Sequence, residues 1–367
     1  MTRPIQASID LDALRHNFSV ARRFAGSASV WAVLKANAYG HGLLRVAQAL
    51  TDSADGFALI EIEGAIALRK AGLRQPILLL EGLYSADELP LAVDYSLTPV
   101  IHSLRQTDML VRADPRDGVR LPVYLKLNTG MNRLGLNTSE FEHAVNALGA
   151  CSLVGAITLM THFSDADCGP DGRGVAEQMK RFEAMRADLA YPVSMANSAA
   201  LLRYPETLGG DQDWLRAGIM LYGSSPFPEL KSAAELTLKP VMTLSSELIA
   251  VRDLAPGDRI GYGGTFVADG PMQVGVVACG YADGYPRQAP TGTPVLVEGR
   301  RTRTLGRVSM DKICVDLRGI SDASVGSPVV LWGRNLPADE VAAVAGTISY
   351  ELFCAITARV PVVEIQP

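Results

Sequence analysis

The stretch SVWAVLKA, residues 29–36, opens the pattern that decides the fold. It is a short apolar run followed by a segment that can form a helix, and seven further runs follow up to about residue 223. They are GFALIEI (56–62), PILLLEG (76–82), SLTPVIHS (96–103), VYLKLNTG (123–130), LVGAITLMTHF (153–163), PVSMANS (192–198) and WLRAGIMLYG (214–223). Repeated strand–helix units predict a parallel sheet. Eight such units in roughly 200–250 residues match a closed (β/α)8 barrel of the TIM type.

Each run but the last is followed by a stretch with helical spacing, for example 61–72, 138–149 and 172–190. A further helix is predicted before the first run, with Asp10 as its cap and Gly26 as its end. An open doubly wound sheet is the structural alternative. It is disfavoured because the first strand–helix turn lacks a GxGxxG motif.

The sequence changes character after about residue 235. From KPVMTLSSELIAVRDLAPGDRIGYGG (239–264) onward, short Val/Ile/Leu runs are broken by Gly, Pro and Asp, and helical spacing returns only at about 337–346. This pattern predicts a second, mostly β domain. We therefore place the barrel at 8–235 and the β domain at 236–367.

Composition limits the possible functions. Of 367 residues, 48% are hydrophobic and 20% charged, which predicts a folded chain with a large core. The net charge of −5, with no basic stripe, argues against nucleic acid as a partner. Five cysteines without a CxxC pair are typical of free thiols in a reducing compartment. We find neither a signal peptide nor an apolar run that could span a membrane, so we expect a soluble, cytoplasmic protein.

Lys35, in AVLKANAYGHG (32–42), is the first candidate for chemistry. It ends the first predicted strand, at the C-terminal mouth where barrels of this type place catalytic groups. A lone lysine there is usually just solvated. Tyr39, however, could donate to a phosphate, and Gly40 and Gly42 leave room for a ligand. A lysine that bonds to a cofactor must lose its proton, which burial and neighbouring cations favour.

Lys126 and Arg133 lie in and after the run VYLKLNTG. Alternation places Lys126 on one covered face of its strand, where an unpaired ammonium is costly. It could reach solvent at the mouth, act as a structural cation, or be carbamylated and hence anionic. Arg133 is a permanently charged fork that suits a carboxylate or phenolate oxygen.

Further candidates end the later runs. His162 is by base rate a structural histidine, and Arg216 inside an apolar strand demands a partner. Ser198 is predicted to cap the short helix after Asn197 and to leave N–H groups for a phosphate. In the second domain, Tyr262, Tyr281, Met310 and Tyr350 sit in Gly-rich or turn-like segments that are weak signals individually. We find no metal-ligand spacing and expect no metal.

Taken together, nine segments resemble the alanine racemase family: AVLKANAYGHG, LKLNTGMNRLG, THFSDAD, ANSAA, WLRAGIMLYG, GYGG, GYADGYPR, SMD and ISYE. They occur in the family's order, and the resemblance runs over almost the whole length of the chain. The resemblance implies a (β/α)8 barrel and a C-terminal β domain that strand 1–7 joins. It also implies a head-to-tail homodimer in which one subunit's barrel and the other's β domain share each active site.

The resemblance implies pyridoxal 5'-phosphate (PLP) as cofactor, held covalently by Lys35. It assigns the phosphate to Tyr39, Ser198, Gly218, Ile219 and Tyr350. Asn197 would line the cofactor site, and Arg133 would contact the cofactor phenolate oxygen and the substrate carboxylate. Lys126 matches the family's carbamylated lysine, which steers Arg133.

Racemisation needs a base on each face of the substrate Cα. The resemblance assigns one face to Lys35 and the other to Tyr262 from the partner subunit. Met310 of the partner would offer its backbone N–H to the substrate carboxylate, and Tyr281 and Tyr350 would form a gate. His162 would stand beside the Tyr262 base.

Arg216, beyond His162, would face the pyridine nitrogen of PLP. The implied activity is interconversion of L- and D-alanine, either to supply D-alanine for peptidoglycan or for alanine catabolism.

Two alternative classes of protein share parts of this layout. A PLP-dependent decarboxylase would need a Gly-rich phosphate loop, which ANSAALLR lacks, and a PLP-carrier protein would lack everything after 235.

Overall fold

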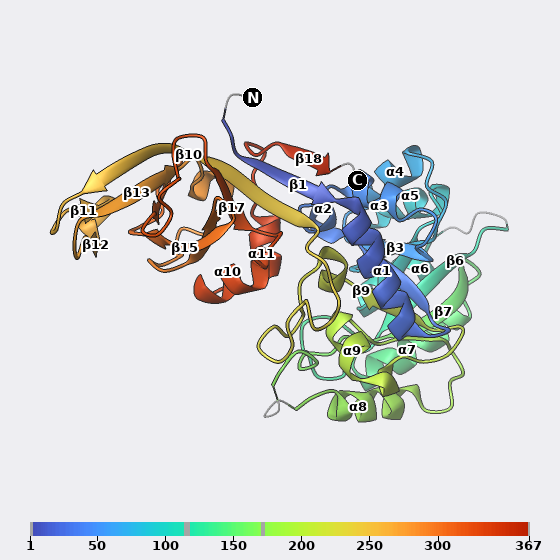
Figure 1. Ribbon diagram of the computed structural model, residues 1–367. Helices are drawn as coiled ribbons and strands as arrows, with labels where there is room; N and C mark the ends of the chain where they lie inside the picture. The colour runs from blue at the N-terminus through green and yellow to red at the C-terminus, as the bar shows by residue number, and fades with distance from the viewer. Residues whose placement is uncertain (1–2, 114–117, 170–172, 366–367) are drawn as a thin grey trace.

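A computed structural model describes residues 3–113, 118–169 and 173–365 and contains two lobes (Figure 1). The first is the predicted barrel. Eight parallel strands lie in the order β8-β7-β6-β5-β4-β3-β2-β9, and Arg216 N donates to Ala196 O (2.9 Å) between β9 and the end of β8. The strands are β2 (Ser29–Val33), β3 (Gly56–Leu59), β4 (Ile77–Leu79), β5 (Thr98–Ile101), β6 (Leu121–Lys126), β7 (Val154–Met160), β8 (Val193–Ser194) and β9 (Trp214–Ala217).

Helices cover the outside of the barrel (Figure 1). The first begins as predicted, because Asp10 Oδ1 accepts from Ala13 N (2.8 Å), and it ends before Gly26. The helix expected at 172–190 is shorter, since Ala187 takes a φ of +47° directly after Arg186; residue 172 lies outside the described residues. The helices are α1 (Leu11–Ala25), α3 (Leu43–Ala49), α4 (Ile62–Lys70), α5 (Leu89–Asp94), α6 (Leu104–Val111), α7 (Thr138–Gly149), α8 (Ala176–Arg186) and α9 (Ser198–Arg203).

The second lobe is a mostly β unit with strand order β13-β16-β15-β14-β17-β10-β1-β18, and β10 also pairs with β13. The N-terminal strand β1 pairs antiparallel with β10 and parallel with β18, so both chain ends join this sheet. Its strands are β1 (Gln6–Asp10), β10 (Met242–Leu254), β13 (Met272–Val277), β14 (Pro294–Val297), β15 (Arg300–Leu305), β16 (Ile313–Asp316), β17 (Pro328–Trp332) and β18 (Val362–Ile365). A small hairpin, β11 (Arg259–Ile260) with β12 (Phe266–Val267), lies at its far end.

Two helices of the β unit pack toward the barrel. The first, α10 (Ala338–Val344), falls in the stretch where helical spacing was predicted, and the second, α11 (Ser349–Cys354), was not predicted. A Cβ on Gly40 would lie 2.2 Å from Phe353 O, so only glycine allows α11 to approach the turn after Lys35 this closely. The same helix carries Tyr350 to the barrel mouth. None of the described helices is long and apolar enough to cross a membrane.

Candidate active site

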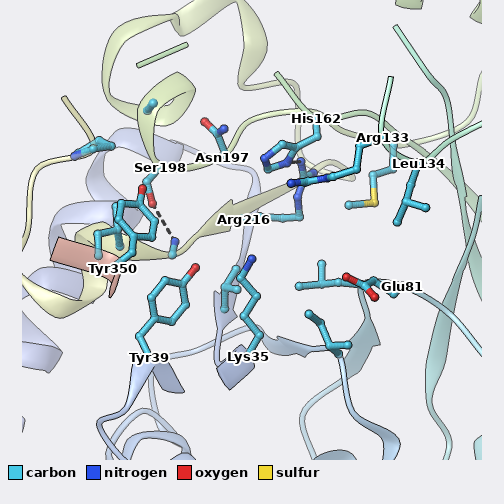
Figure 2. A pocket seen from close by; sticks show the side chains of 18 of the residues that line it. Lys35, Tyr39, Glu81, Arg133, Leu134, His162, Asn197, Ser198, Arg216 and Tyr350 are labelled. Atoms are coloured by element: carbon cyan, nitrogen blue, oxygen red, sulfur yellow. Dashed lines mark hydrogen bonds between the residues drawn. The ribbon is translucent and has the colours of Figure 1, made fainter. Parts of the chain in front are cut away.

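A cavity of about 170 Å³ opens at the carboxyl ends of the barrel strands. Eleven residues predicted from the sequence line it: Lys35, Tyr39, Lys126, Arg133, His162, Asn197, Ser198, Arg216, Gly218, Ile219 and Tyr350. Figure 2 shows Tyr39, Ser198 and Tyr350 at one side and Arg133, His162 and Arg216 at the other, with the Lys35 amine between them. Residues from five barrel strands or their following turns therefore converge with one residue of α11.

Lys35 begins an unusual turn, labelled α2 (Lys35–Tyr39). Ala36, Asn37, Ala38 and Tyr39 have φ values of +52°, +54°, +54° and +51°, so the turn is left-handed. Each such residue costs on the order of 1–3 kcal/mol unless its surroundings impose the conformation. Local bonds do so here, since Asn37 Oδ1 accepts from Leu43 N (2.8 Å) and Gly40 N donates to Ala36 O (3.0 Å).

His41 supplies the innermost support of this turn. Its Nδ1 lies 2.8 Å from Tyr39 O and 3.1 Å from Ala38 O, so Nδ1 must carry the proton and donate. Nε2 has no hydrogen-bond partner among the described residues and is enclosed by the rings of Tyr222 and Phe353. Burial lowers the pKa of His41 to about 4, so the ring is neutral at physiological pH.

A pH-dependent stability follows from His41. Because its folded pKa lies below the ordinary 6.5, the unfolded chain binds more protons between pH 6.5 and 4, and stability falls as pH is lowered through this window. The full effect is roughly 3 kcal/mol. His41→Asn, whose amide can still donate to the two carbonyls, should lose less stability between pH 7 and pH 5 than the wild type in urea unfolding. Equal losses in both proteins would contradict the role of His41.

One side of the cavity is rich in donors for an anion. Ser198 Oγ accepts from Gly218 N (2.8 Å), and Tyr39 stacks on Tyr222 at 4.6 Å between ring centroids. A Cβ on Gly218 would lie 2.8 Å from Tyr39 Oη, so glycine keeps this space open.

The prediction that Ser198 caps the short helix α9 is wrong. Asn197 caps α9, since its Oδ1 accepts from Ala200 N (3.0 Å), and this frees the Ser198 hydroxyl for the cavity.

The other side is cationic. Arg216 is 4% exposed and donates to three carbonyl oxygens, those of Ser194 (2.7 Å), Thr161 (2.7 Å) and Met195 (3.0 Å). Burial lowers its pKa from 12.5 to about 10, which still leaves it charged at neutral pH. His162 Nδ1 lies 3.3 Å from Arg216 Nη2 and can only accept from it, so the neutral ring carries its proton on Nε2. Burial, followed by the charge of Arg216, lowers the pKa of His162 well below its ordinary value.

Both lysines of the cavity lie in a setting that favours the neutral amine. Burial, followed by the charge of Arg133, lowers the pKa of Lys35. Lys126 is 7% exposed, and burial, followed by the charges of Arg216 and Arg133, lowers its pKa to about 8. Lysines in such settings are candidates for covalent chemistry.

Sequence reasoning missed the acidic groups of the cavity. Glu81 and Asp167 line it, and Glu81 opposes the lowering of the pKa of both lysines. The Glu81 carboxylate accepts from Tyr84 Oη (2.6 Å) and lies on the far side of Lys35 from Tyr39 (Figure 2). Glu81 follows the buried run PILLL, and that position at a strand end was the signal that could have identified it.

Three predicted site residues lie outside this cavity, on the β unit. The side chains of Tyr262, Met310 and Tyr281 are 72%, 51% and 37% exposed, respectively. Tyr262 begins the turn η4 (Tyr262–Gly264) and Tyr281 begins η5 (Tyr281–Asp283). A single chain therefore does not bring them to Lys35.

Fold and site together are typical of one class: barrel proteins with a cavity at the strand ends that can take a small anion beside a lysine of lowered pKa. Residues 9–226 match the family model "Alanine racemase, N-terminal domain", and residues 241–364 match "Alanine racemase, C-terminal domain". The chain is 54% identical to an alanine racemase of Nitrosomonas eutropha and 51% identical to a catabolic alanine racemase of Klebsiella aerogenes, with all of each chain covered. The crystal structure of the biosynthetic alanine racemase of Pseudomonas aeruginosa matches with a TM-score of 0.95 at 45% identity, again over both full chains.

The protein belongs to the alanine racemase family, whose members are PLP-dependent isomerases. The cavity fits that cofactor. Its anion-donor side, with the space left by Gly218, can take a phosphate, and a lysine of lowered pKa stands where an aldehyde needs a neutral amine.

Proposed function

We propose that the protein interconverts L- and D-alanine by a two-base mechanism, with Lys35 as one base and Tyr262 of the partner subunit as the other. The observation that carries this proposal is the position of Lys35 between an anion-donor side and a cationic side. Bound PLP withdraws electrons from the substrate Cα, which makes its proton acidic. The protein residues then need only to hold the substrate and move that proton.

The residues that would hold the phosphate are Tyr39, Ser198, Gly218, Ile219 and Tyr350, with Asn197 beside the ring. Arg216 would face the ring nitrogen. Because Arg216 stays protonated, it can only donate, and the nitrogen would remain an acceptor. A weaker electron sink limits the lifetime of a carbanion and so limits side reactions such as transamination.

Arg133 would take the substrate carboxylate, since its guanidinium lies near the mouth and is exposed. The partner's β unit would supply Tyr262 as base, Met310 N–H to the carboxylate, and Tyr281 to the gate beside Tyr350. The exposure of all three side chains supports this assignment, because they are free to meet a second subunit. His162 supports it too, since its Nε2–H can stabilise a tyrosine phenolate.

The activity is tested with L-alanine and the purified protein. We expect loss of optical activity until equal amounts of both enantiomers remain, and a yellow protein whose visible band sodium borohydride abolishes. Lys35→Ala should be colourless and inactive. A Lys35→Ala protein with an unchanged spectrum would contradict the assignment of Lys35, and a wild type that leaves L-alanine unchanged would contradict the function.

We also propose that Lys126 is carbamylated. An ammonium here would repel Arg133, whereas a carbamate would attract it; opposite charges a few ångströms apart interact by on the order of several kcal/mol at an effective dielectric of ~20. In the reaction, the Nζ lone pair attacks the carbon of CO₂, an N–C bond forms as one C=O π pair moves onto oxygen, and one N–H proton passes to solvent, which leaves a carbamate anion. With a pKa of about 8, roughly one amine in ten is neutral at pH 7, which supports the reaction.

Carbamylation of Lys126 should depend on pH. At constant dissolved CO₂, the carbamylated fraction should rise from pH 6 to pH 8, because only the neutral amine reacts. We expect a carbamate signal in ¹³C NMR with labelled bicarbonate, and its absence in Lys126→Ala. That variant should lose activity, and added acetate should restore part of it. A wild type that is active without any carbamate signal would refute the modification.

Three broader assignments complete the proposal. The enzyme would serve either D-alanine supply for peptidoglycan or alanine catabolism, and relatives of both descriptions match the chain. A cytoplasmic location is supported by five cysteines that are all free thiols. We retain 8–235 and 236–367 as the domain boundaries, with residues 1–7 assigned to the second domain.

A further inference from the structure

Both ends of the chain carry an arginine that reaches the same buried carboxylate. Arg3 lies three residues before β1, and Arg359 lies three residues before β18. These strands are parallel neighbours with Ala7 opposite Val362, so the two arginines lie at the same end of the strand pair. Both side chains point to Asp283.

Asp283 is completely buried, and its carboxylate is satisfied on all sides. Arg3 donates from Nη1 to Oδ1 (2.7 Å) and from Nη2 to Oδ2 (2.9 Å), and Arg359 Nε lies 3.3 Å from Oδ1. Gly280 N adds a bond to Oδ2 (3.0 Å). Arg3 thus binds both oxygens of the buried carboxylate, and a bidentate contact of this kind is strong and geometrically specific.

This carboxylate belongs to the turn that carries Tyr281. Asp283 is the last residue of η5, and Tyr281 N donates to Ser309 O (3.0 Å) while Ala282 N donates to Met310 O (3.0 Å). The turn of Tyr281 and the segment of Met310 are therefore tied to each other. Arg359 also holds the second segment, since its Nη2 donates to Asp311 Oδ1 at 2.5 Å.

Side-chain packing within this chain does not fix Tyr281 and Met310, because both side chains are substantially exposed. Their placement depends on the backbone beneath them. That backbone is held by one network of alternating charge, in the order Arg3, Asp283, Arg359, Asp311.

We propose that Arg3 and Arg359 are positioning residues for the partner's active site. They would act through Asp283 and Asp311, setting the gate tyrosine Tyr281 and the Met310 N–H for the alanine bound in the other subunit. This inference rests on the proposed function, which places both residues against the partner's barrel. Displacing a binding group by about 1 Å can lower the rate on the order of 10²-fold, so a partial loss of the network should be measurable.

Arg359→Gln tests the role, because it breaks the contacts to both aspartates while Arg3 still neutralises Asp283. We expect the KM for alanine to rise on the order of tenfold, with a smaller change in kcat and an unchanged fold by circular dichroism. Arg359→Lys, which keeps the charge, should recover part of the loss.

Arg303→Gln is the matched control. The side chain of Arg303 is 45% exposed and lies 3.2 Å from the carboxylate of Asp316, which is 7% exposed. The side chain of Arg359 is similarly exposed, at 41%, and lies beside the buried carboxylate of Asp283. The Arg303 pair is in the same β unit, and among the described residues Arg303 forms no hydrogen bond or ion pair with the Tyr281 or Met310 segments. Its KM should stay at the wild-type value.

Two purified heterodimers would distinguish an effect of Arg359 on the partner's site from an effect on the site of its own chain. In the first, a Lys35→Ala, Arg359→Gln chain is paired with a wild-type chain, so the only working barrel faces the altered β unit, and KM should be raised. In the second, a Lys35→Ala chain is paired with an Arg359→Gln chain, so the working barrel faces a native β unit, and KM should be normal.

The reverse pattern would mean that each site lies within one chain, and it would overturn both the shared site and this inference. A normal KM in both heterodimers would overturn the inference alone, since the shared site is tested separately by mixing Lys35→Ala with Tyr262→Phe.

Discussion

Mixing inactive Lys35→Ala protein with inactive Tyr262→Phe protein should restore racemase activity that neither has alone. In a mixed dimer, one site would join the native Lys35 of one chain to the native Tyr262 of the other. Random exchange makes half of the dimers mixed, and each has one intact site of two, so about a quarter of the wild-type activity should return. The measurement is the racemisation rate after subunit exchange, followed by mass spectrometry of the intact dimers.

The same experiment has an internal control. A chain with both substitutions has neither a working barrel nor a working β unit. When it pairs with a wild-type chain, both shared sites contain one defect, so adding it should lower the wild-type activity. If each site instead lies within one chain, the wild-type subunit should keep its full rate, and the first mixture should remain inactive despite proven exchange.

The barrel could be predicted in detail because its signal is local. Each apolar run contains one buried strand, and even the two-residue strand β8 (Val193–Ser194) is bounded by apolar residues that made it visible in PVSMANS. Helix ends were predicted where a side chain marks them, as Asp10 does. The end of α8 was not, since it depends on a positive φ at Ala187, a residue type that gives no warning of this.

The chemistry-bearing residues of the cavity could likewise be predicted, because they sit at strand ends and in motifs. Residues that support them could not. His41 was not identified as a support of the left-handed turn, because the burial that keeps its ring neutral comes from Tyr222 and Phe353, which are distant in sequence. Asp283 lies within the quoted motif GYADGYPR, yet its two arginine partners are at opposite ends of the chain. Such long-range pairing leaves no periodic pattern in one sequence.

Among variants that keep the cofactor, the largest effect is expected for Tyr262→Phe, which removes the phenol oxygen of the second base. Removing a general acid–base group costs typically on the order of 10²–10⁴-fold in rate, so racemisation should fall by about this factor in both directions. The ring of Tyr262 is 72% exposed in the isolated chain, and the phenylalanine keeps the hydrocarbon part that would contact the partner. The fold and the yellow colour should therefore be retained.

Tyr262→Phe should nevertheless treat the two enantiomers differently. A base on one face of the substrate carbon cannot reach a proton on the other face, so each enantiomer must lose its α-proton to a different group. The family resemblance assigns L-alanine to Tyr262 and D-alanine to Lys35. In heavy water, the variant should still exchange the α-proton of D-alanine slowly through Lys35, whose burial lowers its pKa, and should scarcely exchange that of L-alanine. Proton NMR of each enantiomer measures this directly. Equal residual exchange of both would mean that one base serves both faces, and the two-base mechanism would have to be abandoned.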